Sequence, residues 1–443
     1  MNRRNFQKNL AATTMFGLAA LQTGTSQAQI LGANERIRCG FIGIANRGGQ
    51  LLTAFEANPT EMEVAGLCDI NSETLGKVHE AHGKKPVAVK DFRDLLSRKD
   101  LDAVVIAAPD HWHALMTVEA CKAGKDVYVE KPMTTTVREG RIMVQAARKY
   151  QRVVQVGTHR RSAPHYIELA KQGADQLVGF VTMARCFRLT NMMPNGIGRC
   201  KPTTPPENLD WDLWVGPRPE QEYQENIAPY KFRWWDGYSS QVGNWGVHYF
   251  DAIRMILHEE APESVCAMGG KFAVDDDRTI PDTMAAVFQF KSGRLMTFAQ
   301  GEACGNPMMA TDANYRPLGE VEFRGTNGTL YVSDRQSRIY PERGGQFGEP
   351  GPRMNAVELP GTPLGETERL HALNFLNCIR TRELPNADVE IGQRSTTMCH
   401  LANISFALKQ RLEWDAVNEC FPGNDAANAL LHYEYRAPWK LEL

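Results

Sequence analysis

The sequence predicts an α/β domain with a parallel sheet, followed by an α+β domain with a large, mostly antiparallel open sheet. Three observations favour this order. The chain has 443 residues, 42% of them hydrophobic and 23% charged, so it can bury the cores of two or more domains. Up to about residue 158, short β-branched runs alternate with helix-like stretches. Beyond it, loops rich in Pro, Asn, Gly and Trp are followed by longer β-rich runs.

The first 28 residues have the pattern of an export signal. Arg3-Arg4-Asn5-Phe6 precedes an apolar stretch over residues 10–21, and Ser26-Gln27-Ala28 offers small residues for a signal peptidase. The stretch is too short for a lasting membrane span. Because the paired arginines resemble a twin-arginine signal, we expect a periplasmic or otherwise exported protein from which residues 1–28 are removed. A cytosolic protein with a basic start by chance is the alternative.

The net charge and the cysteine pattern of the chain limit the kinds of ligand, anchor and cross-link that we expect. A formal net charge of −2 creates no field that attracts nucleic acid or an anionic membrane, so we expect a small neutral or polar ligand. The ten cysteines lack framework-like spacing, and Cys39, Cys68 and Cys121 fall inside predicted elements, which favours buried thiols over disulfides. No lipobox precedes Cys39, so we expect no membrane anchor.

Residues 35–158 are predicted to form the α/β domain. Its expected strands are 39–44, 63–68, 103–107, 127–129 and 153–156. Its expected helices are 50–57, 72–81, 113–123 and 137–150. This alternation is typical of βαβ units whose parallel sheet is covered by helices on both faces.

Residues 159–443 are predicted to form the α+β domain. Its expected strands are 178–189, 285–290, 295–300, 321–324 and 329–332. Its expected helices are 245–257, 369–380 and 392–411. Residues 191–238 and 341–365 are rich in loop-forming residues, so both segments are predicted to be loops.

A glycine-rich turn follows the first predicted strand and opens a helix. It reads Gly43-Ile44-Ala45-Asn46-Arg47-Gly48-Gly49. In a dinucleotide-binding turn, the first glycine permits a tight turn, helix N-terminal amides hold a pyrophosphate, and a later glycine permits close packing. Ala45 replaces the usual second glycine, and its methyl group would crowd the phosphates slightly. A turn without a ligand fits this motif alone equally well, so the residues after it must decide.

Asp69 ends the second predicted strand, about twenty residues beyond the turn, where a carboxylate can accept both ribose hydroxyls. Because a carboxylate repels a 2′-phosphate, Asp69 favours NAD. A helix N-cap is its alternative role.

Pro109, Asp110, His111 and His113 follow the next central strand, at the edge where ligands bind in such sheets. Two histidines one residue apart, with no third ligand at a clear spacing, make a poor zinc site, so we expect no metal. We expect these residues to pack around the nicotinamide ribose instead.

At Glu130-Lys131-Pro132, which ends the next strand, the sequence resembles a known family. The glycine turn, Pro109–His113 and Glu130–Pro132 occur in the order of the glucose-fructose oxidoreductase, inositol dehydrogenase and MocA (Gfo/Idh/MocA) family, and the chain resembles an exported bacterial branch of it. The resemblance covers the mature chain through Gln155–Thr158, Trp214–Pro217, Gly243–His248, His371–Phe375 and Arg436–Trp439.

The resemblance implies that Lys131 lies between nicotinamide and substrate, where its cation orients a sugar hydroxyl, and that His248 is the second catalytic residue. A desolvated lysine can also exchange protons. Many relatives carry an aspartate four residues before this histidine, whereas Asn244 can orient the ring but supplies no charge. An ion pair of Lys131 with Glu130, or a core histidine, is the structural alternative. The resemblance also assigns Glu130, Lys131, Gln155 and Trp245 to the cofactor site.

Several aromatic and arginine side chains could build a carbohydrate platform, because indole faces pack on sugar C–H faces and arginines bind hydroxyls. They are Trp112, Arg160, Arg161, Tyr166, Tyr230, Trp234, Trp235 and Trp245. The expected substrate residues are Lys131, Arg160, Arg161, Tyr166, Asn244 and His248.

Three functions remain open. The first is an NAD-dependent oxidoreductase of a ring hydroxyl on a sugar or glycoside, with tightly retained cofactor because free NAD is scarce outside the cytoplasm. The second is a glycoside hydrolase of the family 109 type, which oxidises a sugar carbon transiently; the Tyr-Pro-Thr-His-Gly context of that branch is absent around His248. The third is a non-catalytic sugar- or nucleotide-binding protein, favoured by Ala45 and Asn244 and opposed by Lys131 and His248. A homo-oligomer is expected from the resemblance.

Overall fold

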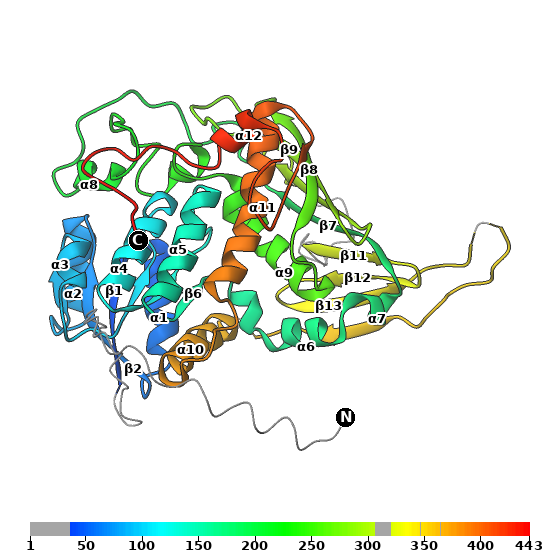
Figure 1. Cartoon of the computed structure of the whole chain (residues 1–443), viewed down its shortest axis with the longest axis horizontal. Coiled ribbons are helices and arrows are strands. Elements are labelled where there is room, and N and C mark those ends of the chain that lie inside the picture. The colour runs from blue at the N-terminus through cyan, green and yellow to red at the C-terminus, as the bar shows by residue number, and fades with distance from the viewer. Residues whose placement is uncertain (1–35, 306–319, 346, 364) are drawn as a thin grey trace, which may run out of the picture. The chain divides into compact units, whose positions relative to one another are not determined.

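Two β-sheets organise the chain, a six-stranded sheet followed by a nine-stranded sheet (Figure 1). The computed structural model describes residues 36–305, 320–345, 347–363 and 365–443. The expected export signal, residues 1–28, lies outside the described residues. Among the helices that are described, none has both the length and the apolar character needed to cross a bilayer.

The first sheet is parallel throughout, with the strand order β3-β2-β1-β4-β5-β6. Its strands are β1 (Ile37–Ile42), β2 (Met62–Cys68), β3 (Val87–Val89), β4 (Ala103–Ile106), β5 (Asp126–Val129) and β6 (Val154–Val156). This order is that of dinucleotide-binding folds, in which ligands bind outside the carboxyl ends of the strands. The predicted parallel sheet is confirmed, and β3 was not predicted because three residues give no readable pattern.

Helices cover both faces of this sheet. They are α1 (Asn46–Glu56), α2 (Ser72–Ala81), α3 (Phe92–Leu96), the short 3₁₀ turn η1 (Asp110–Trp112), α4 (His113–Lys122) and α5 (Val137–Lys149). Thr136 and Glu139 form a reciprocal capping box that fixes the start of α5. Each predicted helix of this domain is present, and α3 was not predicted because it has only five residues.

The second sheet has the order β14-β13-β12-β11-β7-β10-β9-β8-β15. Its strands are β7 (Val181–Leu189), β8 (Pro262–Gly270), β9 (Thr283–Phe290), β10 (Leu295–Gly301), β11 (Val321–Gly325), β12 (Gly328–Val332), β13 (Gln336–Pro341), β14 (Val357–Pro360) and β15 (Leu412–Glu413). Neighbouring strands among these are antiparallel, except that β7 and β10 are parallel. The predicted mostly antiparallel sheet is confirmed.

Several elements of this domain differ from the predictions: strands β8, β13 and β15 were not predicted, and the predicted loop 191–238 contains a short helix over Trp211–Val215. The strand predicted from residue 178 begins at Val181, because Gly179, with φ of 75°, separates it from a preceding short helix. The segment 341–365 was predicted to be a loop, but it contains β14, which pairs with β13. The strand Val357–Pro360 lies between Gly- and Pro-rich stretches that hide its pattern.

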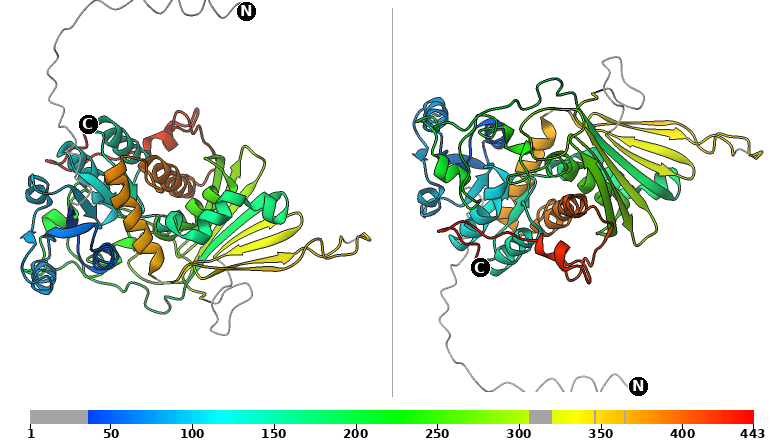
Figure 2. Two further views of the ribbon diagram at one scale, coloured as in Figure 1. Left: turned by 90° about the horizontal axis from the view of Figure 1, so that it is seen from below. Right: turned by 90° about the horizontal axis from the view of Figure 1, so that it is seen from above.

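The helices of the second domain are α6 (Pro164–Gln172), α7 (Ala174–Val178), α8 (Trp211–Val215), α9 (Val247–Leu257), α10 (Glu366–Thr381), α11 (Val389–Leu408) and α12 (Asp425–Ala429), with short turns η2 (His159–Ser162), η3 (Lys231–Trp234) and η4 (Val242–Gly246). On α9, Phe250 packs against Phe288 and Phe298 of the sheet. One face of the large sheet is therefore covered by helices, as both views of Figure 2 show.

Two C-terminal helices connect the domains. The side chain of Phe375 on α10 packs against Phe55 and Tyr128 of the first domain. Helix α11 contacts both α5 and β8, and it runs between the two sheets in Figure 1. These two helices pack against both domains and therefore hold the two sheets in a fixed relation to each other.

Candidate functional site

The turn between β1 and α1 requires glycine at two positions. Gly43 has φ of 76°, and a Cβ there would lie 2.9 Å from the backbone of Ala107. A Cβ at Gly48 would overlap the carbonyl oxygen of Gly43. These contacts bring the turn against the neighbouring strand, which is the close packing that a phosphate-binding turn needs.

The N-terminus of α1 is free to bind an anion. No side chain caps this helix, and its first turn contains no acidic residue. Its first backbone amides therefore keep their hydrogen-bonding capacity, which fits a pyrophosphate. Ala45 is exposed and has φ of −79°, so the backbone does not require glycine there. Asn46, with φ of 27°, takes the left-handed conformation of the turn.

Asp69 stands at the carboxyl end of β2 and faces the cavity. Its Oδ2 accepts from the backbone amide of Ile44 at 3.0 Å, and its Oδ1 accepts from that of Asn71 at 2.8 Å. Burial raises the pKa of its carboxyl group. The alternative role as a helix cap is wrong, because the side chain of Asn71 caps α2 by accepting from Thr74. Each Asp69 oxygen keeps a lone pair for a ribose hydroxyl.

A cavity of about 230 Å³ lies at this edge of the sheet. The predicted cofactor residues that line it are Gly43, Ala45, Asn46, Arg47, Asp69 and Pro109. Its opposite wall is formed by residues 206–236, which we call the covering segment. Pro206, Leu209, Leu213, Phe232 and Arg233 of this segment face the cavity.

The covering segment is fixed to the first domain. The amide of Ser72 donates to the carbonyl of Asn208 at 2.8 Å, and the amide of Asp210 donates to the carbonyl of Ile70 at 3.3 Å. The ammonium of Lys90 lies 3.5 Å from a carboxylate oxygen of Asp210. These contacts join the segment to the loop after Asp69, beside the expected ribose.

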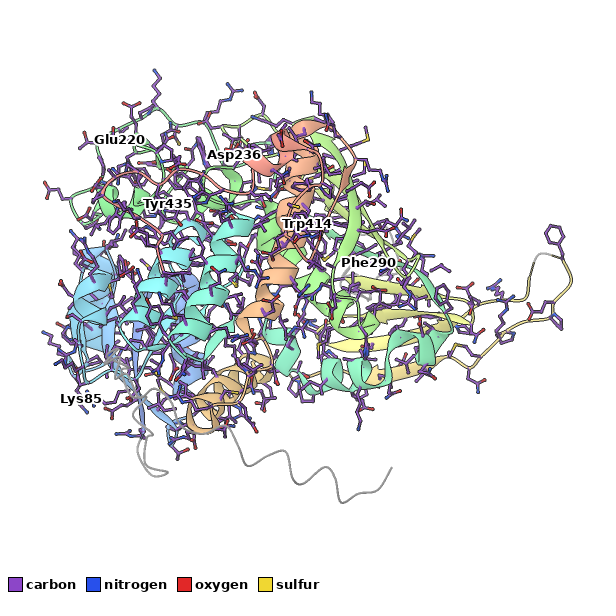
Figure 3. All side chains as sticks on the ribbon, viewed as in Figure 1. Lys85, Glu220, Asp236, Phe290, Trp414 and Tyr435 are labelled. Carbon is purple, nitrogen blue, oxygen red and sulfur yellow. The ribbon has the colours of Figure 1, made fainter. Side chains whose placement is uncertain are left out.

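The C-terminal tail and the large sheet hold the segment from other sides. The guanidinium of Arg436 donates to Asp212 at 2.6 Å and to the carbonyl of Gly216 at 2.9 Å. The indole of Trp234 donates to both carboxylate oxygens of Glu302 at 3.0 Å. Figure 3 labels Glu220 and Asp236 on the segment and Tyr435 on the tail beside it.

His111 belongs to this anchoring and not to the cofactor surface, so its predicted role is corrected. Its Nε2 lies 2.9 Å from the carbonyl oxygen of Trp214, and the side chain is fully buried. Burial lowers its pKa to about 3. The indole of Trp112 likewise donates to the carbonyl of Leu213 at 3.0 Å. The covering segment packs over these two side chains, which the sequence order alone does not reveal.

His113 and Gln155, predicted to bind cofactor, brace the backbone instead. The two ring nitrogens of His113 lie 2.8 Å from the carbonyl oxygens of Ala108 and Pro132, so this ring fixes the ends of β4 and β5. Gln155 is fully buried and donates to the carbonyl of His371 at 2.9 Å. Both side chains support the site without facing the cavity.

Glu130 connects the nucleotide turn to Lys131. The guanidinium of Arg47 donates to Glu130 Oε1 at 2.8 Å, and the backbone amide of Lys131 donates to Oε2 at 3.1 Å. Burial alone raises the pKa of Glu130, but the charges of Arg47 and Lys131 outweigh it and lower the pKa. The predicted alternative, a surface ion pair of Lys131 with Glu130, is wrong because Glu130 is buried and bound to Arg47.

Lys131 donates hydrogen bonds to Asn244, which lies one helical turn before His248. Nζ of Lys131 donates to the carbonyl oxygen of Asn244 at 2.8 Å and to its Oδ1 at 3.1 Å. Asn244 lies in η4, a π-helical turn, and His248 follows one turn later in α9. Burial lowers the pKa of Lys131 to about 8, although Glu130 and Asp110 raise it in part. Asp110 is buried and bound to Ser239, so it lies in the same charged environment.

His248 is held as a neutral imidazole. Burial lowers its pKa well below 6.5, and the nearby charge of Lys131 lowers it further. Its Nδ1 is buried without a partner among the described residues, and the ring of His159 lies 5.1 Å away. An uncharged imidazole with an open nitrogen is suited to accept a proton.

Three predicted substrate residues have structural roles. Arg160 is buried and binds Glu320 at 2.7 Å and Asp334 at 2.9 Å. Arg161 binds Asp251 at 2.8 Å, and the ring of Tyr166 is fully buried. These side chains hold the second domain together, so their assignment to the substrate is corrected.

Trp245, predicted to bind the cofactor, is not among the residues that line the cavity. Its ring packs beside the core of the second domain, and the guanidinium of Arg188 lies over it at 3.7 Å. In the predicted aromatic platform, Trp234 and Trp235 bind Glu302 and the carbonyl of Asn226, while Tyr230 remains exposed. The platform therefore does not form one surface.

The sequence reasoning missed His159 and Arg233. His159 lies in η2, directly after the segment that ends at Thr158, and burial lowers its pKa to about 3. Arg233 lines the cavity from the covering segment. A basic residue within the aromatic run 230–235 was a usable signal, but nothing in it indicated that the run faces the nucleotide turn. Among the residues that the structure describes, no three His, Cys, Asp or Glu side chains gather as metal ligands.

Family comparisons cover most of the chain. Residues 37–158 match the Gfo/Idh/MocA oxidoreductase family, described as having an NAD-binding Rossmann fold. Residues 184–295 and 327–441 match the description of a C-terminal alpha/beta domain of the oxidoreductase family. Together these matches span both sheets.

Curated relatives match part of the chain. A Glycosyl hydrolase family 109 protein of Saccharopolyspora erythraea is 32% identical over 171 residues, which are 34% of this chain and 37% of the relative. An Inositol 2-dehydrogenase/D-chiro-inositol 3-dehydrogenase of Shouchella clausii is 31% identical over 152 residues, which are 34% of this chain and 44% of the relative. The chain matches less than half the length of each.

Solved structures share the fold over most of their length. A levoglucosan dehydrogenase in complex with NADH and levoglucosan has a TM-score of 0.63 at 17% identity, covering 86% of this chain and 99% of that one. An NAD binding oxidoreductase from Klebsiella pneumoniae has a TM-score of 0.65 at 17% identity, covering 85% and 98%. At these identities the likeness concerns the fold alone.

Proposed function

We propose that this chain, which belongs to the Gfo/Idh/MocA oxidoreductase family, is an NAD-dependent enzyme that oxidises a ring hydroxyl of a sugar or glycoside. The observation that carries the proposal is the chain of contacts from the nucleotide turn through Arg47, Glu130 and Lys131 to Asn244, one turn before His248. It connects a dinucleotide-binding turn to a buried cation and a neutral imidazole. With a hydride acceptor bound, the imidazole can take the hydroxyl proton and the cation can stabilise the charge that develops on the oxygen.

The residues around the cavity suit NAD. The tight glycines Gly43 and Gly48 and the uncapped start of α1 would hold the pyrophosphate, and Asp69 would accept the ribose hydroxyls. Because a carboxylate at this position repels a 2′-phosphate, NAD is favoured over NADP. Bound there, the nicotinamide ring supplies a hydride acceptor.

In the proposed reaction, His248 takes the proton of the substrate hydroxyl. Its pKa lies well below 6.5, so the imidazole is unprotonated at neutral pH and available as a base. Lys131, as a cation held by the two Asn244 oxygens, donates to the same hydroxyl oxygen and stabilises the negative charge that develops there. Asn244 orients Lys131 without neutralising it.

The covering segment supports the proposal that the cofactor is retained between turnovers. It forms one wall of the cavity and is held by the first domain, the C-terminal tail and the large sheet. In this proposal, release of a bound nucleotide requires some of these contacts to break. Such retention suits an enzyme carried folded to the periplasm by the twin-arginine signal of residues 1–28, the location that we propose.

We also propose that the protein assembles through the open face of the large sheet. Met268, at 75% exposure, and Val287, at 41%, project from β8 and β9 on the face opposite the covering helices. Exposed apolar side chains on a broad sheet are typical of subunit interfaces.

The cofactor test comes first. Denatured protein, purified without added nucleotide, should release NAD in near-stoichiometric amount, measured by chromatography of the supernatant. Neutral and acidic sugars and their methyl glycosides, offered to the native protein, should then reduce the bound NAD for at least one substrate, followed at 340 nm. A protein that neither contains nor binds NAD would contradict both the oxidoreductase and the hydrolase functions.

The second candidate is the transient oxidation and re-reduction used for glycoside hydrolysis. Its support is that several curated relatives over the same segment are described as glycosyl hydrolase family 109 proteins. Aryl glycosides distinguish the two functions: release of the aglycone without net NADH formation favours hydrolysis. Net NADH without aglycone release favours the oxidoreductase, and NAD binding without either reaction favours the non-catalytic alternative.

A further inference from the structure

Arg188 lies at the carboxyl end of β7, next to the proposed active site. The strand alternates, so Arg188 shares a face with the buried side chains Ala184 and Cys186, while Arg185 points to the other face. Its guanidinium lies 3.7 Å from the centre of the Trp245 ring. Trp245 follows Asn244 directly and precedes His248 by three residues. Arg188 therefore adjoins the helical turn that holds Lys131.

Among the described residues, Arg188 has no carboxylate partner. Three other arginines of this region are neutralised: Arg47 binds Glu130, Arg160 binds Glu320 and Asp334, and Arg161 binds Asp251. No ion pair or hydrogen bond involves the side chain of Arg188 in the part of the chain that is described, and its Nε is buried without an acceptor. A buried donor without a partner costs free energy that a ligand can recover.

Acidic groups of this region that the structure describes are already engaged. Glu320, Arg160 and Arg188 all act on the pKa of the Tyr249 hydroxyl, so Glu320 lies in the same region as Arg188. Glu320 binds Arg160, and Glu302, two residues beyond the Gln300 that pairs with Arg188 across the sheet, binds Arg278 and Trp234. The guanidinium thus remains available to donate two parallel hydrogen bonds to a ligand, and the indole of Trp245 holds it in place.

We propose that Arg188 binds a carboxylate of the substrate, so that the substrate class is an acidic sugar, such as a uronic acid or its glycoside. This rests on the proposed function, because it assigns the substrate of the same site. A planar guanidinium with one face on an aromatic ring presents its edge in a single direction, and a carboxylate fits that edge with two parallel hydrogen bonds. A neutral sugar hydroxyl offers no such pair.

The test compares acidic sugars with their neutral parents. Calorimetry on the NADH-loaded protein measures binding of methyl glucuronide, galacturonide and mannuronide against the corresponding methyl hexosides. At least one acid should bind about tenfold to a hundredfold more tightly than its parent. In Arg188→Gln this preference should disappear, and in Arg188→Lys it should be partly kept. Arg185→Gln is the matched control, since Arg185 lies 3.4 Å from Glu322 and shares the strand but not the face.

Two results would overturn the proposal: no acid binds more tightly than its parent, or the preference survives in Arg188→Gln. Turnover separates this from the proposed function. Reduction of bound NAD by neutral sugars without any acid preference would leave the oxidoreductase standing and remove the acidic substrate. Binding of an acidic sugar that depends on Arg188, without reduction of NAD by any sugar, would keep the acidic ligand and remove the oxidoreductase function.

Discussion

The two halves of the site are built in different ways. On the nucleotide side, Gly43 and Asp69 directly follow parallel strands, and Pro109 comes shortly after a third, so the order of the strands alone brings them to one edge. On the substrate side, Lys131 donates a hydrogen bond to Asn244, 113 residues away in sequence, and Arg188 of β7 packs on the ring of Trp245.

The electrostatics differ as well. The buried arginine of the nucleotide side, Arg47, is paired with Glu130. On the substrate side, His248 Nδ1 and Arg188 Nε are buried without partners among the described residues. A paired network holds a shape, whereas unpaired buried donors and acceptors are places where a ligand gains free energy. The comparison therefore separates the residues that hold the cofactor from those that act on the substrate, and each experiment below tests that separation.

Lys131→Ala should have the largest effect. It removes the proposed cation and leaves the two Asn244 oxygens without their donor, so kcat/KM should fall by about 10³-fold, the upper end for loss of a donor that stabilises developing charge. The NAD content of the purified protein should remain near that of the wild type. A variant that keeps its turnover, or that loses its NAD in proportion to its activity, would remove Lys131 from the substrate side.

His248→Gln should reduce kcat/KM by about a hundredfold, a smaller loss because Asn244 gives the imidazole no charged partner to strengthen it. His258→Gln, at the other end of α9, is the control and should keep full activity. Steady-state rates with a fixed sugar check both variants. Equal losses in the two would mean that the change acts through the helix and not through the imidazole.

Arg436→Ala tests the nucleotide side through the covering segment. Loss of the bonds to Asp212 and Gly216 should speed NAD release by about three- to tenfold, with little effect on kcat when NAD is in excess. Release can be followed by capture of the freed NAD with a coupled dehydrogenase. Arg353→Ala, which removes a pair with Glu349 in the second domain, should leave release unchanged. If both variants release NAD at the wild-type rate, the segment does not retain the cofactor.

The pH profile tests the charge of Lys131. Its pKa is lowered to about 8, so the protonated form predominates below that pH and is lost above it, while His248 stays neutral throughout. We expect kcat/KM to fall as the pH rises through about 8. Lys131→Arg, which keeps its charge, should be slower but should lose this alkaline fall. A rate that instead rises through pH 8 would show that the neutral amine acts as the base.

Asn244→Asp should have the smallest effect at neutral pH. A carboxylate in place of the Oδ1 that now lies 3.1 Å from Lys131 Nζ favours the charged lysine, so its pKa should rise by about one unit or more. The fall of kcat/KM at alkaline pH should move to higher pH by the same amount, while the rate at pH 7 changes only a few-fold. If the fall stays at the same pH, Lys131 is not the group that titrates.

The sequence by itself determined the parallel sheet, its βαβ order and the nucleotide residues at the strand ends. The hydrophobic periodicity of each element and the order of strands and helices can be read along the chain. Parallel strands connected in that order bring their carboxyl ends to one edge of the sheet. It also located Lys131 and His248, through motifs that resemble a family now matched over residues 37–158 and most of 184–441.

Only the tertiary structure decided which polar side chains face the site. His111, His113 and Gln155 lie in motifs of the family, as Lys131 does, yet all three bind backbone carbonyls in the interior. The covering segment reads as an irregular loop, and its position depends on partners from Ile70 to Arg436. A side chain's direction is set by what packs over it, and for His111 and Gln155 that packing comes from segments more than a hundred residues away.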